Sequence, residues 1–148
     1  KVGYPNRQEE RAIVDRMGAG EVPAVEAVIT PEDLVRARSV VDAVYVDAKI
    51  KDYVVDLILA TRDPVSYGLK DLAPLIEYGC SPGGSLFLTR AARAHAFLRR
   101  RGYVTPEDVK AVGLDVLRHR IIVTYEAEAE EIVPEDIIKQ VFDHIEVP

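Results

Sequence analysis

Apolar residues recur at spacings of three and four along most of the chain, which is the period of an α-helix with one buried face. Five such stripes follow residue 30, and we predict that each faces a common core. They consist of Leu34, Ala37, Val41 and Val44; Ile50, Tyr53, Val54, Leu57 and Ile58; Phe87, Ala91, Ala94 and Leu98; Val109, Val112 and Val116; and Ile137, Ile138, Val141 and Ile145.

A tripeptide marks the start of three of these helices, because Pro-Glu-Asp occurs at residues 31–33, 106–108 and 134–136. Proline at the first helical position loses no needed hydrogen bond, and the two acids face the positive end of the helix dipole. Thr30 and Thr105 can cap the first two copies, whereas Val133 has no side-chain acceptor for the third. The copies are 75 and 28 residues apart, so they indicate recurrent capping and not a repeat architecture.

Other helix ends are also marked. Asp47 is the expected N-cap of the helix with the second stripe. An earlier helix is expected over residues 7–17, where Asn6 and the glutamate three residues later form a capping box and Gly18 and Gly20 end the helix. A long helix is predicted from residue 82 to about 101, with Gly102 in the C-cap position.

Strand signals are weak. The only short apolar runs are at residues 1–4, 27–29 and 121–124, and none is long enough to build a sheet alone. We therefore predict an all-α fold, a helical bundle with at most a small β ribbon. The longest stretch without helical periodicity covers residues 63–81, and a loop of that length in a compact domain is usually functional or packed against something.

Size and composition favour one domain, so residues 1–148 are expected to form a single helical unit. The chain has 148 residues, of which 48% are apolar and 30% charged, and it contains no apolar run of the roughly 18 residues that a membrane span requires. A single cysteine excludes an internal disulfide and is typical of a cytoplasmic protein. Because the chain begins at Lys1 and not at methionine, we expect it to be part of a longer protein.

The net charge of −6 makes nucleic-acid binding an unfavoured function, but this charge is unevenly distributed. Basic residues number 10 against 14 acids in residues 1–83, 8 against 3 in residues 84–120, and 1 against 8 in residues 121–148. A basic middle therefore precedes an acidic end. Two interpretations remain open: solvated helix faces that pair with each other, and a charged interface with another domain or subunit.

The segment from Gly79 to Leu86 has two glycines five positions apart, which is the spacing of a phosphate-binding P-loop. The motif requires lysine and then serine or threonine after the second glycine, whereas Ser85 and Leu86 stand there. The segment is thus a glycine-rich helix start whose free N–H groups could help to bind an anion, or an ordinary loop-to-helix junction.

Other reactive residues form no catalytic set. Cys80 has no neighbouring base, and His95, His119 and His144 have no metal-ligand spacing, so neither a catalytic thiol nor a metal site is expected. The acidic residues Glu126, Glu128, Glu130 and Glu131 lack the ligand pattern of a calcium loop. An autonomous enzyme is therefore not supported.

Two arginine clusters are interface candidates: Arg99, Arg100 and Arg101, and Arg118 with Arg120. Both follow predicted helices, where cations complement the negative end of the helix dipole. They could also contact phosphates or an acidic partner surface. The alternative function for the chain is accordingly a helical nucleic-acid or protein-binding module that uses the basic region between Arg99 and Arg120.

Several motifs together resemble the carboxy-terminal lid of the MoxR family of AAA+ ATPases. The family pattern Gly-Ala-Ser-Pro-Arg-Ala-Ser is similar to residues 79–85 here, and an alanine-rich helix follows. The patterns Gly-x-x-Tyr-Val-x-Pro-x-Asp-Val and Val-Leu-Arg-His-Arg correspond to residues 102–109 and 116–120. Residues 124–129 and 134–136 resemble the family's ending, and residues 4–10 resemble the segment that enters the lid from the ATPase core.

This resemblance implies a lid that closes over ATP and magnesium held mainly by a separate core, with residues 1–6 as the linker from that core. It also implies a ring, commonly a hexamer, and partners with von Willebrand factor A domains whose complexes such proteins remodel. The nucleotide-proximal residues by resemblance are Tyr4, Pro5, Ser81, Pro82, Gly83 and Gly84. The chain lacks a P-loop lysine, so alone it is expected to be inactive as an ATP hydrolase and to hold no cofactor.

One position departs from the family pattern. The residue after Ser-Pro is the sensor-2 arginine in the family, which reaches the γ-phosphate, and it is Gly83 here. Arg90 lies two turns further along the helix on roughly the same side, which is about 10 Å away by helical rise. Three consequences of this replacement remain open for the ring: it hydrolyses ATP slowly, it senses the nucleotide through backbone groups at the helix start, or it uses an arginine from another subunit.

Overall fold

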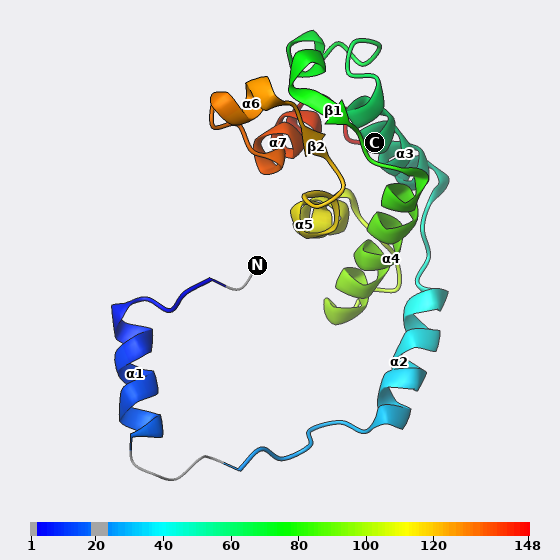
Figure 1. Ribbon diagram of the computed structural model, residues 1–148. Coiled ribbons are helices and arrows are strands. Elements are labelled where there is room, and N and C mark those ends of the chain that lie inside the picture. The colour runs from blue at the N-terminus through cyan, green and yellow to red at the C-terminus, as the bar shows by residue number, and fades with distance from the viewer. Residues whose placement is uncertain (1–2, 19–23) are drawn as a thin grey trace. The chain divides into compact units, whose positions relative to one another are not determined.

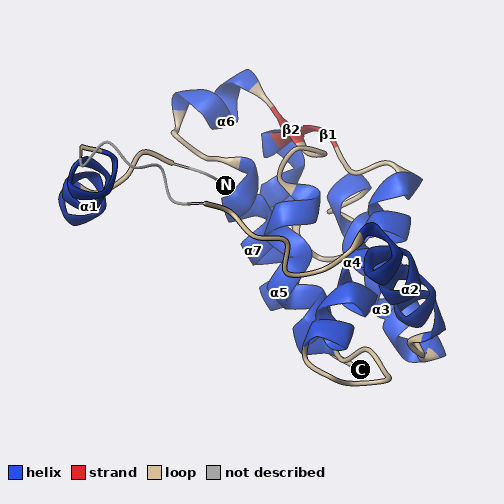
Figure 2. Ribbon diagram, turned by 90° about the horizontal axis from the view of Figure 1, so that it is seen from below, coloured by secondary structure: helices blue, strands red, loops and turns tan. Residues whose placement is uncertain are grey.

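The computed structural model describes residues 3–18 and 24–148 and divides the chain into two compact units, Lys1–Val35 and Arg36–Pro148. Helices dominate both units (Figures 1 and 2), and the prediction of an all-α bundle with at most a small ribbon is confirmed. Among the described helices, none combines the length and the apolar character that crossing a bilayer demands.

The first unit contains α1 (Arg7–Met17) and the start of α2 (Pro31–Ala43), which continues into the second unit. The predicted capping box of α1 is confirmed, since Asn6 Oδ1 accepts from the N–H groups of Gln8 and Glu9, and the Glu9 carboxylate accepts from the Asn6 N–H. Gly18 is the C-cap, while Gly20 lies outside the described residues. No α1 side chain is buried against the rest of the described chain.

The second unit is built on four longer helices around one core: α3 (Ala48–Arg62), α4 (Pro82–Leu98), α5 (Pro106–Leu117) and α7 (Pro134–His144). Helix α4 packs between α3 and α5 (Figure 1), and α7 contacts both α3 and α5. The predicted stripes of α3 and α7 are confirmed, because all five residues of the first and three of the four in the second are buried. In α5, Val109 is buried and the other two valines are half-buried.

The predicted face of α4 is wrong by about one residue of rotation. The buried side chains are Gly84, Leu88, Ala92 and Ala96, whereas Phe87 is 44% exposed and Leu98 is 75% exposed. The predicted stripe included Phe87 and Leu98, which lie outside the buried face. Three of the four buried residues are glycine or alanine, and such small residues allow α3 and α5 to approach the helix closely.

The stripe predicted for α2 is also not buried as a unit. Leu34 is 50% exposed, Ala37 and Val41 are half-buried, and only Val44, just beyond the helix, enters the core. Helix α2 thus forms from its own capping signals, since Thr30 and Asp33 exchange hydrogen bonds across its first turn.

A small ribbon pairs two segments of the second unit that lie far apart in the sequence. Within the stretch 63–81, a 3₁₀ helix η1 (Lys70–Leu75) places Leu72 in the core, and β1 (Ile76–Tyr78) follows. Strand β1 pairs antiparallel with β2 (Ile122–Val123), and the short helix α6 (Tyr125–Ala129) comes next. The predicted strand at residues 121–124 is thus confirmed. Residues 27–29 form no strand, and neither do Gly3 and Tyr4, while Lys1 and Val2 lie outside the described residues.

All three Pro-Glu-Asp tripeptides begin a helix as predicted. In each copy the aspartate carboxylate accepts a hydrogen bond from the backbone N–H three residues earlier, on Thr30, Thr105 or Val133. The third copy therefore retains this half of the capping box although Val133 has no side-chain oxygen.

The end of α4 differs from the prediction. Gly102 is not the C-cap; Arg99 is, and Arg100 adopts the left-handed conformation with φ of 59°. The Arg101 N–H donates to Ala96 O and the Arg100 N–H to Phe97 O, so the last turn is closed before the glycine is reached.

Candidate functional site

The turn at residues 79–84 is held tightly against the end of α3. A side chain on Gly79 would meet the Thr61 carbonyl oxygen at 2.2 Å, so only glycine fits there. The Cys80 N–H donates to Thr61 Oγ1 at 2.9 Å, and the Arg62 Nε donates to the Cys80 carbonyl. These contacts place the N-terminus of α4 at a defined position beside α3.

The first turn of α4 is open by comparison. Ser81 is the N-cap in extended conformation, its side chain makes no capping hydrogen bond, and Pro82 is the first helical residue. A Cβ at Gly83 would meet Ser81 Oγ at 3.4 Å and the Phe87 ring at 3.7 Å, which are ordinary contacts. Gly84 differs, because a Cβ there would lie 3.0 Å from Ile58 Cδ1 inside the core. Position 83 therefore has room for a side chain, whereas a side chain at position 84 would be crowded by Ile58 and Cys80.

Cys80 is fully buried, and burial raises the pKa of its thiol. A thiol of this kind is protonated near neutral pH and packs as a small apolar group. Its place in the structure therefore gives no support to nucleophilic chemistry.

The Asp108 carboxylate lies at the junction of α4 and α5 with no exposed surface. It accepts hydrogen bonds from Arg101 Nη1 at 2.7 Å and Nη2 at 2.6 Å, and from the Thr105 N–H at 2.8 Å. His95 Nδ1 on α4 lies 2.6 Å from Asp108 Oδ1. The cluster ties the two helices and their connecting loop together.

Opposing effects act on this carboxyl group. Burial favours its protonated form, but the Arg101 guanidinium, the Thr105 N–H and His95 together hold the pKa of Asp108 well below its usual range. Asp108 is therefore ionised at neutral pH, and Arg101 is its main counter-charge. The sequence indicates only one member of this cluster, because Asp108 ends the second Pro-Glu-Asp motif; its pairing with Arg101 and His95 has no sequence signal.

Comparison with known proteins identifies the domain. The AAA lid domain model matches residues 70–141. The chaperone MoxR1 of Mycobacterium tuberculosis is 41% identical over 147 residues, which is 99% of this chain and 39% of that protein. The protein MoxR of Paracoccus denitrificans is 42% identical over 118 residues, covering 76% of this chain and 34% of that protein. The chain carries the AAA lid domain of MoxR-type proteins.

A crystal structure agrees with this assignment. A Cytophaga hutchinsonii protein proposed to be an ATPase superposes with a TM-score of 0.94 at 34% identity, covering 99% of this chain and 45% of that one. The chain thus spans less than half the length of each of these relatives. The matched range, 70–141, includes the α4 start and the Asp108 cluster.

The predicted nucleotide-proximal residues fall into two groups. Ser81, Pro82, Gly83 and Gly84 come together at the start of α4 in the second unit. Tyr4, which is fully exposed, and Pro5 precede α1 in the first unit. In this turn Ser85 stands where a P-loop has its lysine. Residues 3–18 and 24–148 contain no group of three His, Cys, Asp or Glu that could hold a metal.

The five candidate interface arginines have different surroundings. Arg99 and Arg100 are exposed, whereas Arg101 is committed to Asp108. Arg118 pairs with Asp115 and lies 3.6 Å from Glu135, and its Nε donates to Leu114 O. Arg120 Nε donates to Val116 O, and its guanidinium lies 4.8 Å from the Phe87 ring centroid. Three of the five therefore have partners inside the lid domain, which leaves a smaller basic surface than the sequence predicts.

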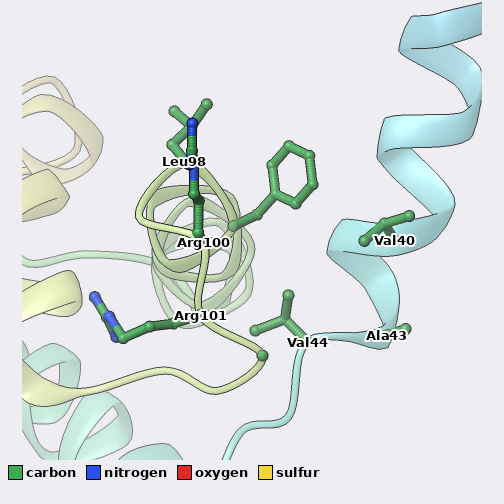
Figure 3. A pocket seen from close by; sticks show the side chains of 8 residues that line it. Val40, Ala43, Val44, Leu98, Arg100 and Arg101 are labelled. Atoms are coloured by element: carbon green, nitrogen blue, oxygen red, sulfur yellow. The ribbon is translucent and has the colours of Figure 1, made fainter.

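A pocket of about 630 Å³ opens beside the exposed arginines (Figure 3). Val40 and Ala43 of α2, with Val44, line one side, and the end of α4 with Leu98 and Arg100 lines the other. The Arg101 side chain extends away from this pocket, on the side of its ion pair with Asp108. The pocket is mainly apolar.

Proposed function

We propose that this chain is the lid of a MoxR-type AAA+ ATPase, which closes over ATP and magnesium bound by a separate core and contributes to ring assembly and to chaperone-like remodelling of partner proteins. The match to the AAA lid domain is the observation that supports this proposal. The relatives are more than twice as long as the matched region, which leaves room in them for such a core. The isolated chain is expected to have no ATP hydrolase activity.

The geometry of the α4 start supports the nucleotide-facing role. The contacts of Gly79 and Cys80 with α3 hold this helix end in a defined position, while Ser81 and Gly83 remain open to a ligand. A ligand that bridges a core and a lid favours the closed arrangement through contacts that exist only there. Residues 1–6 would then be the linker, and Tyr4 and Pro5 would approach the nucleotide from that side.

The finer parts of the proposal follow from the family. Residues 1–148 would act as one lid region of a cytoplasmic protein, the assembly would be a homo-oligomeric ring, commonly a hexamer, and the partners would include proteins with von Willebrand factor A domains. Of the five candidate arginines, Arg99 and Arg100 are exposed and available for a contact between subunits. The net charge of −6 makes nucleic acid an unlikely partner under this proposal.

The test joins the chain to an AAA+ ATPase core of this family and measures ATP turnover. We expect the joined protein to hydrolyse ATP faster than the core alone, because the lid completes the closed state. Equal turnover with and without the chain would contradict the proposal.

Position 83 provides a second readout in the same protein. Gly83→Arg places a guanidinium where the family has its sensor-2 arginine, and we expect ATP turnover to change by about tenfold or more. Gly83→Gln is the control, since it adds a polar side chain, shorter than that of arginine, without the charge, and should change turnover little. If Gly83→Arg and Gly83→Gln behave alike, position 83 does not sense the nucleotide.

A further inference from the structure

A second groove, of about 410 Å³, lies on the lid domain between α3 and α4, and its lining combines apolar residues such as Val54 and Leu86 with several charged ones. Three cationic side chains line it: Lys51 from α3, and Arg90 and Arg93 from α4. Asp42, at the end of α2, is its one acidic lining residue. The charged residues of the groove thus carry a net positive charge, in a chain with a net charge of −6.

The Arg93 guanidinium carries the main evidence. Its Nε is buried and has no hydrogen-bond partner among the described residues. A buried donor without an acceptor is unfavourable, and more so when it belongs to a charged group. Neither Arg90 nor Lys51 forms an ion pair with any residue in 3–18 or 24–148. Arg101, whose guanidinium donates to the buried Asp108 carboxylate, shows how a satisfied guanidinium is arranged in this domain.

The three cations line the same groove. Arg90 and Arg93 are three residues apart and so share a helix face, where like charges repel unless an anion lies between them. Ser85 and Thr89 add hydroxyl groups to the same wall. The Thr89 hydroxyl already donates to Ser85 O at 2.8 Å, whereas the Ser85 hydroxyl makes no such bond within the described chain. Two guanidinium forks, an ammonium and a hydroxyl donor match the oxygens of a phosphate group.

We propose that this groove is a binding site for a phosphate-bearing small molecule, with Arg93 and Arg90 as the main ligands and Lys51 as a supporting cation. The site is distinct from the α4 start and does not depend on the proposed lid function. The occupying phosphate could be a free inorganic anion or part of a nucleotide, which share this chemistry.

The test titrates the 148-residue chain with sodium pyrophosphate and follows the ¹H–¹⁵N signals of the arginine side chains. We expect the Arg93 Nε–Hε signal and the signals of the groove to shift with saturation, and binding to weaken as sodium chloride is raised. Succinate, a dicarboxylate, should bind at least about tenfold more weakly. Equal binding of succinate, or no saturable shift with pyrophosphate, would overturn the proposal.

Substitutions of the groove cations test whether pyrophosphate binds in this groove. Arg93→Gln and Arg90→Gln should each weaken pyrophosphate binding by about tenfold or more, while Arg99→Gln, at the exposed end of the same helix, should change it less than about twofold. If Arg93→Gln does not fold, Arg90→Gln and Lys51→Gln decide, because both replaced residues are exposed. Equal losses in all variants, the Arg99 control included, would overturn the groove as the site.

A last comparison distinguishes the source of the phosphate. Tighter binding of ATP than of pyrophosphate, with the same Arg93 dependence, would indicate a nucleotide, and equal or weaker binding a free anion. Either result supports the site. Because ATP turnover of the joined protein is measured separately, failure here would leave the lid proposal standing.

Discussion

The two units of the chain form helices by the same local rules but differ in burial. Helix α1 has a complete capping box, yet its apolar residues Ile13, Val14 and Met17 are each at least half exposed. Helix α3 has one capping contact, from the Lys49 N–H to Asp47 Oδ1, and buries seven residues. Capping therefore determines where a helix begins, whereas burial determines how much the helix contributes to stability.

The largest expected loss of stability comes from truncating a buried side chain, and it tests the difference in burial between the two units directly. Leu57 is 1% exposed in the core, and Leu57→Ala should cost about 3 kcal/mol through lost transfer energy and the cavity left behind. Ile13→Ala removes a similar side chain that is 50% exposed and should change the free energy of unfolding by less than about 0.5 kcal/mol. Urea unfolding followed by circular dichroism measures both, and similar losses would contradict the comparison.

The aspartates of two Pro-Glu-Asp copies allow the same comparison between a buried and an exposed residue. Asp108→Asn should destabilise the chain by about 3 kcal/mol, because the Arg101 guanidinium would lose its charged partner in a buried setting. Asp33→Asn changes the equivalent residue of the first copy, where Asp33 caps an exposed turn, and should cost no more than about 1 kcal/mol. Thermal unfolding of the two variants should separate them clearly; a large loss in Asp33→Asn would show that the first unit is more cooperative than its burial indicates.

Acid should weaken the second unit through the same residue. The pKa of Asp108 is lower in the folded than in the unfolded state, so its contribution is fully present above the unfolded value of about 4 and is lost as pH falls below it. Urea unfolding between pH 7 and pH 3 should show a decline in stability that is shallower in Asp108→Asn. Parallel declines in the two proteins would exclude Asp108 as the source.

The smallest expected effect is an increase in the free energy of unfolding. Arg100 occupies the left-handed conformation that glycine adopts without strain, so Arg100→Gly should stabilise the chain by about 1 kcal/mol. Gly102→Arg is the reverse control, at a position without positive φ where a Cβ would meet no atom within 4 Å, and it should be close to neutral. Destabilisation by Arg100→Gly would mean that the arginine side chain contributes more than its backbone costs.

The sequence predicts the AAA lid but not the ion pair that holds part of it together. The family motifs correctly indicated the AAA lid, and they include the turn at residues 79–84. The cluster of basic residues suggested Arg101 as an interface residue, while the structure turns it toward Asp108. That pairing joins residues seven apart across a loop, and no periodic pattern encodes which way the loop folds.

Sequence alone determined the helix starts, because a capping residue and the N–H groups it satisfies lie within about four positions of each other. Tertiary structure decided which face of α4 is buried, which residue ends that helix, and that β1 pairs with a strand far along the chain. It also left the Arg93 Nε buried without a partner among the described residues. These outcomes depend on how closely distant segments approach, which is a property of packing and not of local hydrogen bonding.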